Sequence, residues 1–567
     1  IILVCLGAIA SSSGAKAQSC HAETCLPLQS GLIKTTPLLK SPEEITVKKR
    51  QEQTSSSRFG RCFDFKKLPF RTADGSCNNY FTSHGESEQP LARLLPAQYG
   101  DSSFAPRKFS TVNPANPLPS PRDVSRAVHP DITATSQLTI MMMQWGQFID
   151  HELVSTPLPI EDTRGLQQCC GDGMTAPTEP PTNPECFPIV FSTSDPDFDG
   201  ECMEFFRSQP ALDEYGNMTT PRENRNSVTS FLDASTVYGS TEERLASVRD
   251  EANPHLLKTT ADNFPPDNGL DDCVKRDSND ICFLAGDERA NEHPALTLTH
   301  TIFMRLHNLI ASEIMAIVTH NDADQVFRLA RSVVEAIEQQ ITYGEWLPIL
   351  LGPTVRSEFD LDLNKNIRYQ MAVDPRIVSE FSTAAFRIGH TLIPRSFPLS
   401  STRRVNLREI FFKPFEAREN LDSLAEGILT AIDPEDRMQP SDNFVVDEVT
   451  AHLFENQEGA RKGFDLVSLN LQRGRDHGIP PYNDVREALG LSRVTSFSDS
   501  ALGANGALLQ SVYDHVDDME LFAAGLSEPL HDGGLAGETF SRLIATQFQR
   551  LRAGDRFFYL NNRIFKK

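Results

Sequence analysis

Two histidine-centred motifs, far apart in the chain, carry residue types that could do redox or acid–base chemistry. The first, Met-Gln-Trp-Gly-Gln-Phe-Ile-Asp-His-Glu at positions 143–152, sets an amide, a carboxylate and an imidazole within one helical turn. Gln147 and His151 stand four residues apart and share a helix face, with Asp150 beside them. This cluster could polarise a small oxygen ligand while the carboxylate holds a cofactor. In the second motif, His390 is a candidate axial metal ligand.

The spacing of apolar residues predicts the helices that position these motifs. Few segments alternate with the period of a strand, and Asp374 and Pro375 are placed to cap and open a helix before His390. The sequence therefore predicts a mostly α fold with little β structure. Two stretches have apolar residues at helical three- and four-residue steps: Leu296, Phe303, Leu306, Leu309 and Ile310, then Ile377, Phe381, Ala384, Ile388 and Leu392.

Length and composition favour one large catalytic domain. The 567 residues are 39% hydrophobic and include 35 Phe, which is enough to bury a large core. Length alone would favour several domains, but no linker, repeat or low-complexity run divides the chain after about residue 60. We therefore expect a single domain over residues 59–567. The net charge of −23 disfavours nucleic acid as a partner.

The amino-terminal residues resemble a secretory signal. An apolar run over residues 1–10 precedes Ala15-Lys16-Ala17, an A-x-A cleavage pattern, so we expect residues 1–17 to be a signal peptide, truncated at its start because no initiator Met or basic segment precedes the run. Residues 18–58 are rich in Lys, Thr, Ser and Glu and predict a propeptide or flexible segment. The apolar run is shorter than the ~20 residues of a membrane span. We expect a secreted protein without membrane insertion.

Cysteine usage also suits an oxidising compartment. Removal of Cys5 with the signal leaves ten cysteines, an even number that suits disulfides, and the Pro- and Cys-rich residues 160–200 predict a stapled loop. The single sequon, Asn217-Met218-Thr219, predicts a glycosylated surface loop. Spacing suggests the pairs Cys62–Cys77, Cys273–Cys282 and Cys20–Cys25, and two more bridges among Cys169, Cys170, Cys186 and Cys202.

Five motifs in order along the chain carry a resemblance to a known family. In this order they resemble the animal haem peroxidases of the peroxidase–cyclooxygenase superfamily, particularly the secreted peroxinectin, peroxidasin and chorion types. The resemblance runs from about Cys62 to Phe565 and implies a large, mostly α domain with haem between a distal and a proximal helix. The motifs are residues 143–152, 229–239 (TSFLDASTVYG), 283–289 (FLAGDER), 386–392 (FRIGHTL) and 469–478 (LNLQRGRDHG).

The resemblance assigns three residues to the distal side of the haem. His151 would be the base that takes a proton from hydrogen peroxide and returns it to the departing oxygen, for which it must start neutral. Arg289 would stabilise the negative charge that develops as the O–O bond breaks. Gln147 would hold distal water or a halide through its amide. Without the other motifs, a buried core histidine and a surface ion-paired arginine would be the ordinary interpretations.

On the proximal side, the resemblance implies that His390 binds the haem iron. Asn470 would accept a hydrogen bond from its second ring nitrogen, which makes the imidazole less electron-donating than a carboxylate partner would. Arg387 and Arg473 are candidates to hold the haem propionates, with ordinary ion pairing as the alternative.

The resemblance also implies that Asp150 and Glu292 form ester bonds to haem methyl groups, which would make the haem b covalently attached. His293 follows Glu292 where some family members have a methionine that makes a third, sulfonium link. That link should therefore be absent. Without its electron-withdrawing effect, we expect oxidation of bromide, iodide, thiocyanate or phenols to be favoured over oxidation of chloride.

A calcium site is implied by the motif at 229–239. Thr229, the Phe231 carbonyl, Asp233 and Ser235 form an all-oxygen set that suits a hard cation. In the family an Asp after the distal histidine completes the site. Here that residue is Glu152, which we expect as a further calcium ligand, although its longer side chain changes the geometry of the site.

These residues predict a secreted peroxidase that reduces hydrogen peroxide and oxidises small anionic or phenolic donors, tyrosine included, through ferryl intermediates. Two alternatives follow from the same family. An extracellular adhesion protein could use the fold as a platform, although the chain has no Arg-Gly-Asp or Lys-Gly-Asp triplet. A fatty-acid oxygenase is less well matched by the distal motif and the residues around Glu292. The sequence indicates no particular oligomeric state.

Overall fold

The computed structural model describes residues 70–132, 138–159, 169–170, 175, 183–213, 215–318, 322–364, 368–400, 402–430, 443–455 and 463–561. The predicted signal peptide, the predicted propeptide and Cys20, Cys25 and Cys62 lie outside the described residues. None of the described helices combines the length and the apolar character that a bilayer span requires.

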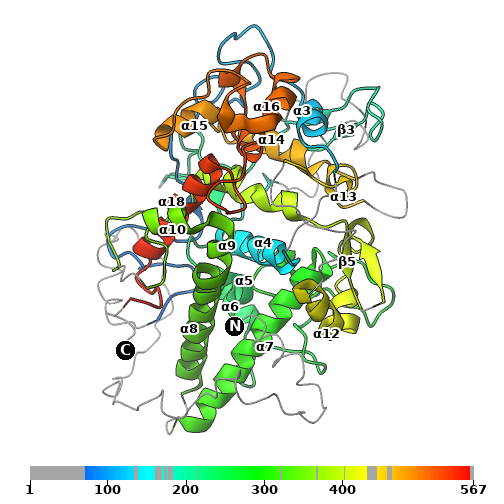
Figure 1. Cartoon of the computed structure of the whole chain (residues 1–567). Helices are drawn as coiled ribbons and strands as arrows, with labels where there is room; N and C mark the ends of the chain where they lie inside the picture. Colours follow the sequence, from blue (N-terminus) through cyan, green and yellow to red (C-terminus); the bar gives the residue numbers. More distant parts are fainter. Residues whose placement is uncertain are drawn as a thin grey trace.

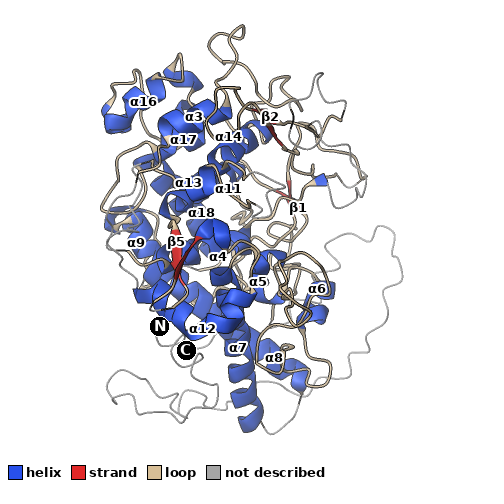
Figure 2. Cartoon of the chain, turned by 90° about the vertical axis from the view of Figure 1, so that its right-hand side faces the viewer, coloured by secondary structure: helices blue, strands red, loops and turns tan. Residues whose placement is uncertain are grey.

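Helices dominate the described chain, as the sequence predicts (Figure 2). The α-helices are α3 (Pro121–Val128), α4 (Met141–Leu153), α5 (Ser235–Tyr238), α6 (Glu242–Val248), α7 (Pro294–Ile317), α8 (Ala323–Ile341), α9 (Leu347–Leu351), α10 (Pro353–Glu358), α11 (Ser379–Thr383), α12 (Phe415–Thr430), α13 (Asp447–Thr450), α14 (Leu466–Asp476), α15 (Tyr482–Ala488), α16 (Gly506–Gln510), α17 (Leu521–Leu526) and α18 (Glu538–Gly554).

The remaining elements are short. Turns of 3₁₀ helix are η2 (Glu288–Asn291), η4 (Ala385–Leu392), η5 (Leu407–Glu409), η6 (Ser500–Asn505) and η7 (Val516–Asp518), and a π-helical turn, η3 (Thr342–Trp346), joins α8 to α9. The strands form three antiparallel pairs: β1 (Gln89–Pro90) with β4 (Arg225–Asn226), β2 (Ile189–Val190) with β3 (Cys202–Met203), and β5 (Ser396–Pro398) with β6 (Arg404–Asn406).

Helix α4, which carries the first motif, lies in the middle of the molecule (Figure 1). Its Trp145 and Phe148 are almost fully buried. Phe148 packs against Phe303 of α7 with ring centroids 5.3 Å apart, and the Trp145 indole donates to Thr342 Oγ1 of η3 at 3.2 Å. The long helices α7 and α8 pack side by side below it. These contacts fix the position of α4 and its rotation about its own axis, and α4 is the helix that carries His151.

The second predicted helix differs from the expectation. Instead of one helix opened by Asp374 and Pro375, the chain forms α11 and then η4, with a break at Ala384 (φ −132°, ψ −68°). A long-range contact keeps the residues before α11 extended: the Ala92 N–H donates to the Ile377 carbonyl at 2.8 Å, and the Ser379 N–H donates to the Ala92 carbonyl at 2.8 Å. Residues paired in this extended way cannot also form a helical turn. The first predicted helix is confirmed as α7.

One main hydrophobic core runs from Leu91 to Phe558 among the described residues. The beginning and the end of the described chain are also joined by buried polar contacts. Arg71 donates to both carboxylate oxygens of Asp555, at 2.9 and 2.5 Å, and the Asn78 amide donates to the same carboxylate at 2.8 Å. We call this group, Arg71, Asn78 and Asp555, the terminal clamp.

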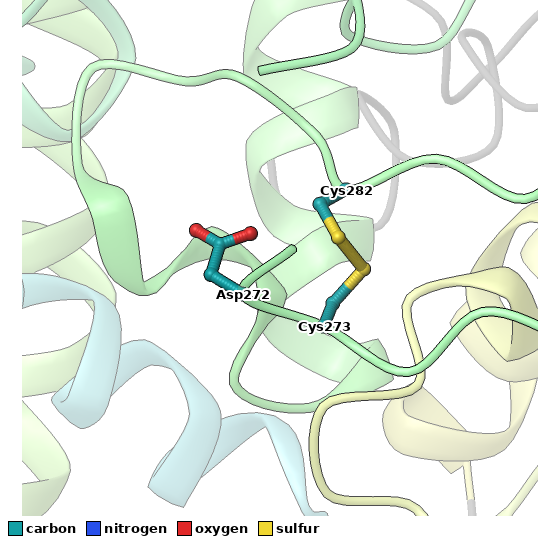
Figure 3. Close-up of side chains that lie close together, drawn as sticks. All are labelled: Asp272, Cys273 and Cys282. Carbon is teal, nitrogen blue, oxygen red and sulfur yellow. A yellow bond between two sulfur atoms is a disulfide. The ribbon is translucent and has the colours of Figure 1, made fainter. Parts of the chain in front are cut away.

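Three disulfides join cysteines of the described chain. Cys169 pairs with Cys186 and Cys170 with Cys202, which confirms two bridges among these four residues and resolves their connectivity. Cys77 is disulfide-bonded, and its predicted partner lies outside the described residues. The Cys273–Cys282 bridge is confirmed as well, and Figure 3 shows it beside Asp272. Because Cys273 and Cys282 are joined in this disulfide, neither of them offers a thiolate to a metal ion.

Candidate active site

His151 lies near the carboxyl end of α4 and is 6% exposed. Its Nδ1 has no hydrogen-bond partner and lies 3.9 Å from Oδ1 of Asp287. Burial, and then the nearby charge of Arg289, hold the pKa of His151 well below its usual value, although Asp287 opposes both. The imidazole is therefore neutral at neutral pH and able to accept a proton.

The Arg289 guanidinium is fixed by a carboxylate and two backbone carbonyls. Its Nε donates to Asp287 Oδ1 at 2.9 Å and one Nη to Asp287 Oδ2 at 2.6 Å. The two Nη groups also donate to the carbonyls of Val154 and His151, at 3.1 and 3.0 Å. Asp287 is also the N-cap of η2, so it holds the turn that carries Arg289. Burial alone would raise the pKa of Asp287, but Arg289 outweighs it and lowers that pKa.

Gln147, one turn before His151, is held from two sides. Its amide nitrogen donates to Glu292 Oε1 at 3.1 Å, and its amide oxygen lies 2.8 Å from Nε2 of His293. Glu292 and His293 come from the junction between η2 and α7. The predicted distal residues therefore converge from α4, η2 and the start of α7.

Two carboxyl groups in this region are partly buried and have no directly paired cation among the described residues. Burial raises the pKa of Asp150 to about 6, and the charges of Arg289 and Arg387 oppose that shift. Burial likewise raises the pKa of Glu292 to about 7, opposed by Arg289. The charges of Arg289 and Arg387 both act on Asp150, so this carboxyl group is within electrostatic reach of the distal residues and of the segment that carries His390.

The structure also brings together His390, Asn470 and Arg387, the residues predicted for the proximal side of the haem. Asn470 Nδ2 of α14 lies 2.8 Å from His390 Nδ1 of η4, and Arg387 donates to Asn470 Oδ1 and to the Ser382 carbonyl, the latter at 3.1 Å. Burial lowers the pKa of His390 to about 3 and that of Arg387 to about 10. Arg387 donates to no carboxylate of the described residues, so it is a partly buried cation without a directly paired anion there.

Arg473 is placed differently from Arg387. It donates to Asp476 Oδ2 at 2.9 Å, to Ser208 Oγ at 3.1 Å and to the Phe206 carbonyl at 2.9 Å, and its guanidinium lies over the Phe205 ring. Asp476 thus already provides a counter-charge for Arg473. Of the two predicted propionate partners, Arg387 is the one whose charge is unmatched.

The sequence comparison decides the family: the model for animal haem peroxidases matches residues 70–567. This chain belongs to the animal haem peroxidase family. It is therefore a peroxidase, an oxidoreductase, and haem is the family's cofactor. The chain is 36% identical over 549 residues to the mouse peroxidasin homolog and covers 36% of that protein, so it spans about a third of its length. It is 34% identical to mouse myeloperoxidase, with 88% of this chain and 72% of that protein covered.

Solved structures agree with the family. Peroxidase A from Dictyostelium discoideum matches with a TM-score of 0.71 and 28% identity, over 87% of this chain and 93% of that one. A fatty acid alpha-dioxygenase from Arabidopsis thaliana matches with a TM-score of 0.67 and 17% identity, over 90% and 80% of the two chains. The second match shows a shared fold alone.

The residues of this peroxidase fit a haem between α4 and η4. Among the described residues Arg387 has no directly paired carboxylate, the carboxyl groups of Asp150 and Glu292 are partly buried, and a side chain added at Gly389, beside His390, would meet no atom within 4 Å. A propionate would neutralise Arg387, and ester bonds would remove the acidic proton of each of these carboxyl groups. The donor chemistry therefore agrees with the cofactor of the family.

The predicted calcium residues also lie together. Thr229 donates to Asp233 Oδ1 at 3.0 Å, and Ser235 donates to the Glu152 carbonyl at 3.2 Å. The Glu152 carboxylate accepts the backbone N–H groups of Asp233, Ser235 and Thr236 at 2.8 to 2.9 Å. Glu152 thus anchors this loop directly to the end of α4, one residue after His151.

The acidic side chains of this loop fit a cation. Burial, and then Asp233, raise the pKa of Glu152 to about 8, and burial also raises the pKa of Asp233 and of Glu338. Asp233 Oδ2 is buried without a hydrogen-bond partner, with Arg331 3.9 Å away. A cation beside Asp233 would satisfy that oxygen and stabilise the charged form of all three acids.

Sequence reasoning missed three residues of this region: Asp287, Glu338 and the hydrogen-bonding role of His293. Asp287 could have been found, because an Asp two residues before the predicted Arg289 has the spacing of a cap for the turn that presents it. Glu338 could not, because only the packing of α8 against the 233–236 loop brings it there, where it accepts the Ala234 N–H at 3.1 Å.

Proposed function

We propose that this protein is a secreted peroxidase in which His151 and Arg289 act on hydrogen peroxide and small anionic or phenolic molecules are the electron donors. The observation that carries the proposal is the distal arrangement: a buried, neutral His151 next to an Arg289 whose orientation is fixed by Asp287. The imidazole is already in the protonation state that accepts a proton, and Asp287 and two backbone carbonyls hold the Arg289 cation beside it.

In this proposal His151 Nε2 accepts the proton of hydrogen peroxide and returns it to the departing oxygen, while Arg289 stabilises the negative charge that develops there. The position of Asp287 Oδ1, 3.9 Å from His151 Nδ1, adds a negative charge that favours the protonated imidazole while it holds the proton. Bound haem would supply the iron that exchanges electrons with peroxide and donor.

His390 would hold that iron, and Asp150, Glu292, Arg387 and Arg473 would hold the porphyrin. An imidazole that ligates through Nε2 carries its proton on Nδ1 and needs an acceptor there. Rotation of the Asn470 amide by a half turn would present Oδ1 to His390, at the cost of its contact with Arg387. We therefore expect Arg387 to turn towards a propionate when haem is bound.

The donor class follows from His293. Because a histidine cannot form the sulfonium link of a methionine, we expect bromide, iodide, thiocyanate and phenols to be better donors than chloride. Calcium would be held by Thr229, the Phe231 carbonyl, Asp233 and Ser235, with Glu152 tying the site to α4.

Secretion and glycosylation belong to the same proposal. The disulfides Cys169–Cys186, Cys170–Cys202 and Cys273–Cys282 suit an oxidising compartment. Asn217 lies on an exposed hairpin, closed by the Asp213 N–H donating to the Asn217 carbonyl at 2.7 Å. Tyr215, 80% exposed on that hairpin, gives a linked sugar an apolar ring to lie against. Loss of one glycan in Asn217→Gln from a secreting host would support this, and an unchanged mass would refute it.

The test of the activity is the visible spectrum of purified, haem-loaded protein before and after one equivalent of hydrogen peroxide. We expect a haem band that changes with peroxide and returns to its first state on addition of bromide or a phenol. A haem band that peroxide leaves unchanged would contradict the proposal.

A further inference from the structure

His293 occupies a position that departs from the family pattern, and the structure gives it a specific partner. It is the N-cap residue of α7, but its side chain makes no capping hydrogen bond. Instead, Nε2 lies 2.8 Å from the amide oxygen of Gln147, one helical turn before His151. The His293 side chain therefore hydrogen-bonds to a residue of α4, the helix that carries His151, and does not cap its own helix, α7.

The direction of this hydrogen bond follows from the other half of the amide, because Glu292, when it is ionised or ester-linked to haem, can only accept. Gln147 Nε2, which can only donate, donates to Glu292 Oε1 at 3.1 Å. The amide oxygen, which can only accept, therefore faces His293, so His293 Nε2 must carry a proton. Burial lowers the pKa of His293 to about 3, and the ring consequently holds a single proton at neutral pH.

The proton on Nε2 leaves His293 Nδ1 as an acceptor, and this buried atom has no hydrogen-bond partner within the part of the chain that the structure describes. A buried lone pair without a donor is unfavourable, and the opposite ring tautomer would lose the Gln147 bond and leave two acceptors facing each other. The environment therefore selects one tautomer. The ring is held in place by Phe397, whose centroid is 5.6 Å away.

The consequence concerns what Gln147 can offer to a ligand. Its oxygen is occupied by His293, and one of its two amide hydrogens is occupied by Glu292. The second amide hydrogen has no partner among the described residues. A donor without an acceptor, near the positive charge of Arg289, suits a small anion or the oxygen of peroxide.

From these contacts we infer that His293 is a positioning residue that locks the Gln147 amide as a hydrogen-bond donor, and thereby favours small anionic ligands such as bromide in the distal site. The inference rests on the proposed role of Gln147. It adds a residue-specific cause: the imidazole at 293 prevents the amide from turning its oxygen towards the ligand.

The experiment is a bromide titration of the haem-loaded protein in its resting state, followed by the shift of its main visible band. His293→Leu removes the N–H donor at similar volume, and His293→Gln keeps an N–H donor at that place. We expect the Kd for bromide to rise roughly 2- to 10-fold in His293→Leu, the effect of one lost neutral hydrogen bond, and to recover in His293→Gln. Should the leucine variant fail to fold, His293→Val answers the same question.

A matched control is His129→Leu, which removes a buried histidine that hydrogen-bonds, at 2.8 Å, the carbonyl of Asn443, a residue far along the chain from Gln147 and its partners. Its Kd for bromide should equal that of the wild type. A wild-type Kd in His293→Leu, or an equal loss in the leucine and glutamine variants, would overturn the inference. Failure of the proposed function looks different, because the wild-type haem band would then not respond to hydrogen peroxide at all.

Discussion

Replacement of Asp287 by asparagine should expose how much of the distal site depends on one carboxylate. The change keeps the shape of the side chain and removes the charge that faces Arg289 at 2.9 and 2.6 Å. Arg289 would retain only the carbonyls of Val154 and His151. Loss of one partner of a fully buried pair costs ~3–5 kcal/mol, and because the Arg289 side chain is 26% exposed, we expect ~2–3 kcal/mol of lost stability.

The rate should fall as well, because Arg289 would no longer be held where charge develops. Complete loss of a preorganised donor costs about 100- to 1000-fold in rate, so a displaced but present Arg289 should cost roughly 10- to 100-fold. The assay is rapid mixing with excess hydrogen peroxide, with the haem band followed in time. A double-mutant cycle with Arg289→Lys isolates the coupling between the two residues.

If Asp287 acts through Arg289, its replacement should have little further effect once Arg289 is changed. Effects that multiply independently in the double variant would refute the reasoning. The matched control is Asp555→Asn, which removes a carboxylate of comparable burial from the terminal clamp. It should lower the stability without changing the rate of reaction with peroxide.

Three further predictions follow from the same structure. In haem-free protein, burial raises the pKa of Glu292 from 4.5 to about 7, so the stability that this group contributes is complete below about pH 4 and is lost, by roughly 3 kcal/mol, as the pH rises through 7. Urea unfolding of Glu292→Gln between pH 4 and 8 should show a smaller decline in the free energy of unfolding than the wild type. An equal decline would contradict the assignment. Removal of calcium should perturb the haem spectrum and lower activity, because Glu152 links the 233–236 loop to the residue next to His151; an unchanged spectrum after verified metal removal would count against that coupling. Replacement of Cys273 and Cys282 by serine opens a loop with a sequence separation of 9 and should lower the free energy of unfolding by about 2–3 kcal/mol in a thermal or denaturant titration, with no change in the peroxide reaction.

Local patterns in the sequence were sufficient where local forces decide the structure. The apolar spacing of Leu296 to Ile310 predicted α7 because that helix buries one face against its neighbours over many turns. The short spacing between Cys273 and Cys282 predicted their disulfide because few other partners were close in the chain.

Long-range contacts decided the rest. The helix expected from Asp374 onwards starts only at Ser379, because Ala92, nearly three hundred residues earlier, pairs with the backbone on either side of Val378. In the same way, the sequence indicated Gln147 and Glu292 as site residues but not the hydrogen bond between them, since their separation of 145 residues leaves no local signal.

The terminal clamp has a consequence for how the protein is made. Arg71 and Asp555 are 484 residues apart, and at a synthesis rate of 5–20 residues per second the ribosome needs roughly 25 to 100 s to travel from one to the other. During that interval Arg71 can pair with Glu335, whose carboxylate accepts from the Arg71 Nε at 3.3 Å, but Asn78 and the other face of the guanidinium still lack Asp555. Intermediates formed on the ribosome should therefore be less stable than the finished domain until α18 and the residue that follows it have emerged.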